Sequence, residues 1–150
     1  MITYDRLADL AALEGQVIGT SGWIEVDQAR IAGFAHATGD LQWIHVDPER
    51  AAAGPFGTTV AHGFLTLSLL SELAAGAWRV ADVRMGLNYG LDRVRFPAPV
   101  PAGSRLRAVC VLQRFEPIAG GAQLTQAVTI EREGGAKPAC VAIWLTRHLV

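Results

Sequence analysis

The residues best suited to chemistry are an acid and a histidine that lie close together in a short polar turn. Asp40 and His45 fall within the stretch GDLQWIH, and His62-Gly63 follows further along at the start of an apolar run. A carboxylate only accepts hydrogen bonds, whereas an imidazole donates and accepts near neutral pH. Together the two side chains can orient one water molecule and move its proton, which is worth roughly 10²–10⁴-fold in rate.

Each of these residues also has an ordinary structural explanation. Asp40 alone could serve as a turn or capping residue, and His45 alone could be an interior histidine with satisfied nitrogens. His62 reads first as a structural residue that positions the helix start. The four histidines of the chain are scattered without a ligand spacing such as HExxH, so we expect no metal site.

The first half of the chain supplies helices around this turn. A strand is expected over Gln16–Val26, followed by a helix over Gln28–Ala37 that Asp27 caps and Thr38-Gly39-Asp40 ends. A short helix over Pro48–Ala53 follows, capped by Asp47. A central helix is then predicted over Val60–Ala75, and because its apolar residues surround the axis we expect it to be buried on all sides.

The second half has the texture of strands. Glycine pairs at 120–121 and 134–135 are typical of hairpin turns. The strands are expected over Val83–Val94, Arg105–Phe115, Leu124–Arg132 and Ala139–Leu145. This order predicts one α+β domain over residues 1–150, with a long helix buried against a curved antiparallel sheet.

The composition excludes several classes of partner. The net charge is −1, so no basic field is available for nucleic acid. The apolar run over Ala61–Ala75 is too short to span a bilayer, and the N-terminus lacks the pattern of a signal peptide. Cys110 and Cys140 stand alone and are expected to be buried reduced thiols of a cytoplasmic protein. The apolar content of 51% favours a subunit interface.

Three stretches in the same order resemble the MaoC-like dehydratases, or (R)-specific enoyl-CoA hydratases. TGDLQWIHVDPERA resembles the hydratase motif of that family, with Gly39, Asp40, Ile44 and His45 matching. Gln42 and Trp43 replace Asn and Pro, as in the NodN-like branch. VAHGFLTLSLLS and NYGLDRVRFPAPVPAGSRLR are similar to the family's helix-opening and later strand segments.

The resemblance implies a hot-dog fold, in which the sheet wraps the central helix, and a homodimer. It implies that Asp40 and His45 hold and activate a water, and that Gly63 offers its backbone N–H to the thioester oxygen. A donor of that kind is worth about 3–4 kcal/mol. Ser71 and Gln42 would have supporting roles. The implied reaction is hydration of a trans-2-enoyl-CoA, without metal or redox cofactor, and with coenzyme A as part of the substrate.

Two alternatives remain open at this point. A hot-dog acyl-CoA thioesterase would also direct a helix N-terminus at a thioester carbonyl, and it would release a free thiol. A non-catalytic acyl-CoA-binding subunit would bind the thioester without turnover. The intact Asp40 and His45 favour the hydratase over both, although fold alone does not decide function.

Overall fold

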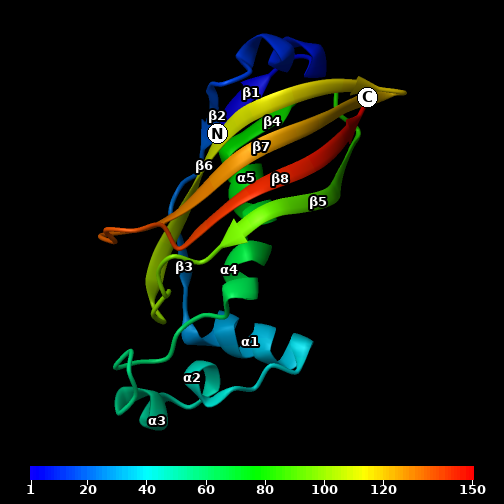
Figure 1. Cartoon of the computed structure of the whole chain (residues 1–150). Coiled ribbons are helices and arrows are strands. Elements are labelled where there is room, and N and C mark those ends of the chain that lie inside the picture. The colour runs from blue at the N-terminus through cyan, green and yellow to red at the C-terminus, as the bar shows by residue number, and fades with distance from the viewer.

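The computed structural model describes residues 1–150, and an antiparallel sheet of six strands dominates it (Figure 1). The strand order is β2-β6-β7-β8-β5, and β3 also pairs with β6. The bounds are β2 Val17–Thr20, β3 Ile24–Val26, β5 Met85–Arg95, β6 Ser104–Ile118, β7 Gly121–Arg132 and β8 Cys140–Leu149. The four strands expected in the second half are therefore confirmed: β6, β7 and β8 are longer than expected, and β5 begins and ends slightly later.

The sheet curves along one side of the central helices, and its inner face supplies most of the core (Figure 1). Buried and half-buried residues alternate along β6, β7 and β8, because successive side chains of a strand point to opposite faces. The inward set includes Leu106, Leu112, Leu124 and Ile130, each with no exposed surface. This is the α+β hot-dog arrangement that the sequence predicted.

The expected single helix over Val60–Ala75 is wrong in detail. Two helices, α4 (Gly63–Ser68) and α5 (Leu70–Ala77), run on through Leu69, whose backbone angles (φ −67°, ψ −12°) are still helical. Val60 lies ahead of them and forms an isolated bridge to Pro101. The helices begin later because Val60 and Ala61 pair with the 97–103 crossover, where the Ala61 N–H donates to the Val100 carbonyl.

The expectation that this segment is buried on all sides is also wrong. Leu65, Leu70, Leu73 and other residues on one side are buried, but Phe64 is 70% exposed. Ser71 and Glu72 are exposed as well. The sheet of one chain covers only one side of the helix pair, which leaves the other side open.

The helices that precede α4 lie together beyond the lower end of the sheet (Figure 1). They are α1 (Gln28–Thr38), α2 (Trp43–Val46) and α3 (Pro48–Ala52). Asp27 caps α1 by accepting from the Arg30 N–H, and Asp47 caps α3 by accepting from the Arg50 N–H, as predicted. Gly39 ends α1 at a φ of +78°, in the left-handed region that favours glycine.

The N-terminal segment forms a short strand and a 3₁₀ helix. It begins with β1 (Ile2–Tyr4), which pairs in parallel with β4 (Trp78–Val80), and continues as a 3₁₀ helix, η1 (Leu7–Leu13). Leu7 and Leu10 are buried and belong to the hydrophobic core. No helix of the chain is long and apolar enough to cross a membrane.

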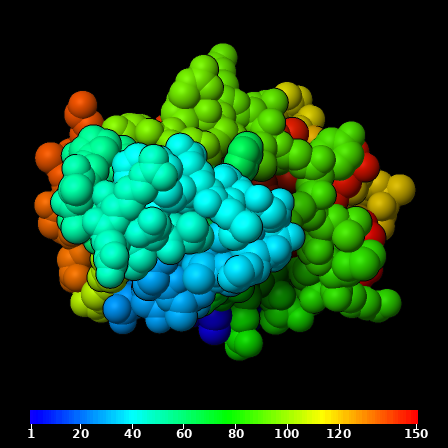
Figure 2. All heavy atoms as spheres, turned by 90° about the horizontal axis from the view of Figure 1, so that it is seen from below, coloured from blue at the N-terminus to red at the C-terminus, as the bar shows by residue number.

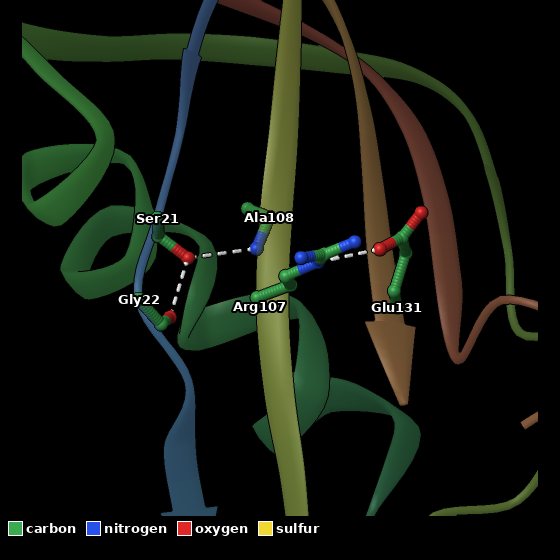
Figure 3. Close-up of polar contacts among 5 residues, drawn as sticks. All are labelled: Ser21, Gly22, Arg107, Ala108 and Glu131. Carbon is green, nitrogen blue, oxygen red and sulfur yellow. Dashed lines mark hydrogen bonds and ion pairs between the residues drawn. The ribbon is translucent and has the colours of Figure 1, made fainter. Parts of the chain in front are cut away.

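The strand expected over Gln16–Val26 is interrupted between β2 and β3, and Ser21 maintains the pairing across the break. Its hydroxyl accepts from the Ala108 N–H at 2.9 Å and donates to the Gly22 carbonyl at 2.8 Å (Figure 3). Beside it on β6, Arg107 pairs with Glu131 of β7 at 2.7 Å (Figure 3). A side chain thus satisfies a backbone amide that the interrupted strand would otherwise leave without a partner.

Candidate active site

The expected dyad residues come together below the lower end of α4, where the chain runs from α1 through α2 to α3. Figure 2, seen from below, shows this segment spread over the face of the molecule. One side-chain ligand atom from each of Asp40, His45 and His62 lies within 4.8 Å of the other two. Asp40 is exposed, whereas both histidines are buried. The Asp40 side chain therefore borders solvent, whereas the two imidazoles near it lie in the interior.

The orientation of His45 is set by backbone partners. Its Nδ1 lies 2.6 Å from the Val60 carbonyl oxygen, and because a carbonyl only accepts, Nδ1 carries the proton. The other ring nitrogen, Nε2, is left with a lone pair. A neutral imidazole with a fixed Nδ1–H is oriented as a general base through Nε2.

The backbone around His45 is held by a side chain from α1. Gln28 Nε2 donates to the His45 carbonyl at 2.8 Å, and the Thr59 hydroxyl donates to Gln28 Oε1. Gln28 thereby connects α1, α2 and the segment that precedes α4. Neither Gln28 nor Thr59 was anticipated from the sequence, because both lie far from His45 along the chain.

Gln42 contributes to the turn through its backbone. Its carbonyl accepts from the His45 N–H at 2.9 Å, and its N–H donates to Asp40 Oδ1 at 3.4 Å. The side chain is exposed and makes no hydrogen bond within the chain. The supporting role expected of Gln42 is therefore, in this structure, a matter of turn geometry.

His62 belongs to the same cluster, which the sequence reading did not anticipate. Its ring stacks on that of His45 with centroids 3.7 Å apart and planes 23° apart. Its Nε2 lies 3.0 Å from the Asp40 carbonyl oxygen. His62 is the N-cap residue of α4, where its carbonyl accepts from the Thr66 N–H at 3.1 Å, but its side chain makes no capping hydrogen bond.

The cluster offers three groups that metals bind, but the ring geometry does not suit an ion. The lone pairs of imidazole lie in the ring plane, and the two rings are stacked almost parallel. Their lone pairs therefore lie in two nearly parallel planes, whereas a metal ion needs ligand atoms that converge at about 2.0–2.1 Å. The arrangement suits the handling of a proton better than the binding of a cation.

Gly63 is the first residue of α4, and its N–H donates no hydrogen bond within the chain. Such an orphaned amide at a helix start is a ready donor to a negative oxygen. A Cβ at this position would meet the Phe96 ring at 2.9 Å. A larger residue here would therefore require the Phe96 ring, which is 40% exposed, to shift.

Ser71 is not brought to the dyad. It lies eight residues beyond Gly63, which is about 12 Å along a helix axis, and it makes no hydrogen bond to Asp40 or His45. Instead it lines two adjoining pockets of about 430 and 380 Å³. The pockets share Ser71, Asn88 and Trp144, and they lie between the helix pair and strands β5 and β8.

The arginines and cysteines behave as ordinary structural residues. Arg105 and Arg107 pair with Glu133 and Glu131, in keeping with a solvated face. Cys110 and Cys140 are free and buried as predicted, and burial raises the pKa of each thiol to about 11. A thiol with that pKa is protonated at neutral pH and is a poor nucleophile.

The comparisons with known proteins now decide the family. A family model described as a MaoC like domain matches residues 9–133. The chain belongs to the MaoC-like dehydratase family.

Two relatives support the branch that the sequence suggested. This MaoC-like chain is 54% identical over 150 residues to 3-hydroxyacyl-thioester dehydratase Z of Mycobacterium tuberculosis, and the match covers 99% of each chain. It is 52% identical over 144 residues to Nodulation protein N of Rhizobium leguminosarum, covering 93% and 89% of the two chains. The likeness to NodN that the sequence suggested is therefore confirmed over most of the chain.

A solved structure confirms the fold. The crystal structure of the MaoC-like dehydratase from Rhodospirillum rubrum matches the MaoC-like chain with a TM-score of 0.77, at 22% identity and over 95% of each chain. At that level of identity the likeness concerns the arrangement of the backbone.

Proposed function

We propose that this chain catalyses the reversible hydration of a trans-2-enoyl-CoA to the (R)-3-hydroxyacyl-CoA, with Asp40 and His45 as its catalytic pair. The observation that carries the proposal is the position of His45. Its Nδ1 is committed to the Val60 carbonyl, and a carboxylate lies within 4.8 Å. The relative that matches nearly the whole chain is named a 3-hydroxyacyl-thioester dehydratase, and this name supports the same class of reaction.

The residues divide the reaction among them. His45 Nε2 takes a proton from a water that Asp40 helps to hold, and the water oxygen forms a bond to C3. The π electrons of the C2–C3 bond move toward the thioester, and the Gly63 N–H stabilises the negative oxygen that results. The dyad then returns the proton to C2, so that one water has been added. The reverse sequence is the dehydration.

We propose that the acyl chain lies in the two adjoining pockets beside α4 and α5. The smaller pocket reaches Leu67, one turn from Gly63, and the larger continues to Val80. Ser71 lines both, so its role in this proposal is to border the acyl chain. No metal or redox cofactor enters the mechanism, and coenzyme A is present only as part of the substrate.

The test follows the absorbance of the enone thioester with crotonyl-CoA and with a longer trans-2-enoyl-CoA. Wild type is measured beside Asp40→Asn and His45→Gln. We expect rapid loss of absorbance with wild type and a fall of about two orders of magnitude or more in both variants. Release of free thiol would indicate the thioesterase instead. Tight thioester binding without turnover would indicate a binding subunit.

We further propose a homodimer joined along β5. This strand is 11 residues long, lies at the edge of the sheet, and is exposed along almost its whole length. Its exposed apolar side chains include Leu87 and Leu91, at 44% and 41% exposure. A long exposed apolar edge is a site for pairing with another strand. The opposite edge, β2, has only four residues and an irregular register.

The dimer is tested by light scattering after size exclusion. A Leu87→Lys and Leu91→Lys double variant is compared with Val17→Lys on β2, where the wild-type side chain is 54% exposed. We expect the β5 variant to become monomeric and the β2 variant to keep the mass of a dimer. A wild-type protein that is monomeric at micromolar concentration would contradict the proposal.

A further inference from the structure

We propose that His62 is a positioning residue of this site, acting through both Asp40 and His45. The inference rests on the proposed function. His62 is a third side chain of the site, and it connects Asp40 and His45, which lie on two other segments of the chain. His62 is 2% exposed, so its contacts are made in the interior, where geometry is fixed by packing.

The first contact restrains the loop that carries Asp40. Residues 39–42 make several short-range hydrogen bonds, such as Leu41 N–H to the Gly39 carbonyl at 3.1 Å. The bond from His62 Nε2 to the Asp40 carbonyl, at 3.0 Å, is the only one that joins this loop to a distant part of the chain. The exposed carboxylate of Asp40 is therefore anchored through its own backbone by His62.

The second contact restrains the ring of His45. The His62 ring stacks on the His45 ring, with centroids 3.7 Å apart, and also contacts the Phe34 ring, with centroids 5.0 Å apart. Val60 fixes one nitrogen of His45, but a single hydrogen bond allows the ring to rotate about it. The stacked face of His62 opposes that rotation and keeps Nε2 directed at the site.

The tautomer of His62 follows from its partners. The Asp40 carbonyl only accepts, so Nε2 of His62 carries a proton. Nδ1 is buried and has no partner. The ring therefore contributes one donor and one flat face. The residue also precedes Gly63 directly, so displacement of His62 would move the proposed oxyanion donor together with the dyad.

Three substitutions separate the contributions. His62→Phe keeps a flat ring against His45 and removes the donor. His62→Gln keeps an N–H near the position of Nε2 and removes the ring. His62→Ala removes both. His36, which is exposed on α1, supplies the control variant His36→Ala.

We measure kcat and KM for enoyl-thioester hydration together with thermal stability. A misplacement of about 1 Å can cost roughly 10²-fold. We therefore expect His62→Ala to lower kcat by about that factor while KM changes by less than about threefold. The Phe and Gln variants should each recover part of the loss, and His36→Ala should match wild type. A His62→Ala protein with kcat within about threefold of wild type would overturn the proposal.

A second measurement does not depend on turnover or on the variants. Nitrogen-15 NMR of the wild-type histidines should report a protonated Nε2 for His62 and a protonated Nδ1 for His45. A His62 ring protonated only at Nδ1 would refute the positioning contact. If the wild-type protein shows these two tautomers but no turnover, the proposed function is wrong, whereas the contacts of His62 with Asp40 and His45 are supported. If His62→Ala does not fold, the Phe and Gln variants test the proposal in its place. A kcat within about threefold of wild type in both of them would then overturn it.

Discussion

Gln28→Met should weaken both the fold and the site, because one side chain serves two buried partners. Methionine has a similar length but no polar atoms. The substitution removes the bond to the His45 carbonyl and the bond from the Thr59 hydroxyl. The two partner residues are 6% and 2% exposed, so each would lose a hydrogen bond that is largely shielded from solvent.

The magnitude follows from counting the orphaned groups. Each buried group left without a partner costs about 1–3 kcal/mol, which gives about 2–6 kcal/mol for two. Gln28 itself is half-buried, so water reaches that side and the lower end applies, about 2–3 kcal/mol. In a chain of this size each kcal/mol lowers Tm by about 2–4 °C, so Tm should fall by about 4–12 °C.

The assay is urea unfolding followed by tryptophan fluorescence at fixed protein concentration, beside the hydration rate. We expect kcat to fall by about tenfold, since the His45 backbone loses its restraint. Gln113→Met is the control, because Gln113 is exposed and makes no side-chain hydrogen bond. Thr59→Val and the double variant Gln28→Met/Thr59→Val complete a double-mutant cycle. The coupling free energy between the two residues should be about 0.5–3 kcal/mol. Equal stability of Gln28→Met and Gln113→Met would refute the reasoning.

Three further predictions concern the rest of the fold. Ser21→Ala orphans the buried Ala108 N–H and should cost about 1–3 kcal/mol in urea unfolding, whereas an unchanged midpoint would contradict this. Burial lowers the pKa of His148, so as pH falls below the unfolded value of about 6.5 the unfolded chain binds the proton first. The free energy of unfolding should then decrease until the folded pKa is passed, and His148→Gln should flatten that dependence. Cys110 and Cys140, whose thiol pKa is about 11, should resist iodoacetamide in the native protein and react in urea; equal rates would show that they are accessible.

Local signals were read correctly wherever the relevant physics is local. Asp27 and Asp47 cap the helices that they precede, and Gly39 ends α1, because capping and left-handed backbone need only near neighbours in sequence. The strand expected over Leu124–Arg132 likewise falls within β7, since a half-buried strand records its two faces in its own residues.

The errors arose where distant segments meet. The central helix begins at Gly63 and not at Val60, because Val60 and Ala61 pair with the 97–103 crossover. Phe64 is exposed although its neighbours in sequence are apolar, because the sheet covers only one side of the helices. Hydropathy along a segment does not say which of its faces will be covered.

The sequence by itself determined the α+β hot-dog class, the family, and the Asp40–His45 pair with Gly63 at a helix start. The α+β class follows from residue types at short spacing, which the chain carries in its covalent order. The hot-dog fold, the family and the roles of these residues follow from the resemblance of three stretches to the MaoC-like dehydratases. Only the tertiary structure decided that His62 stacks on His45, that Gln28 and Thr59 hold the site from behind, and that Ser71 borders the pockets instead of the dyad. Those contacts join residues that are 17 or more positions apart, and they exist because the sheet and helices pack around one core, not because of any local preference.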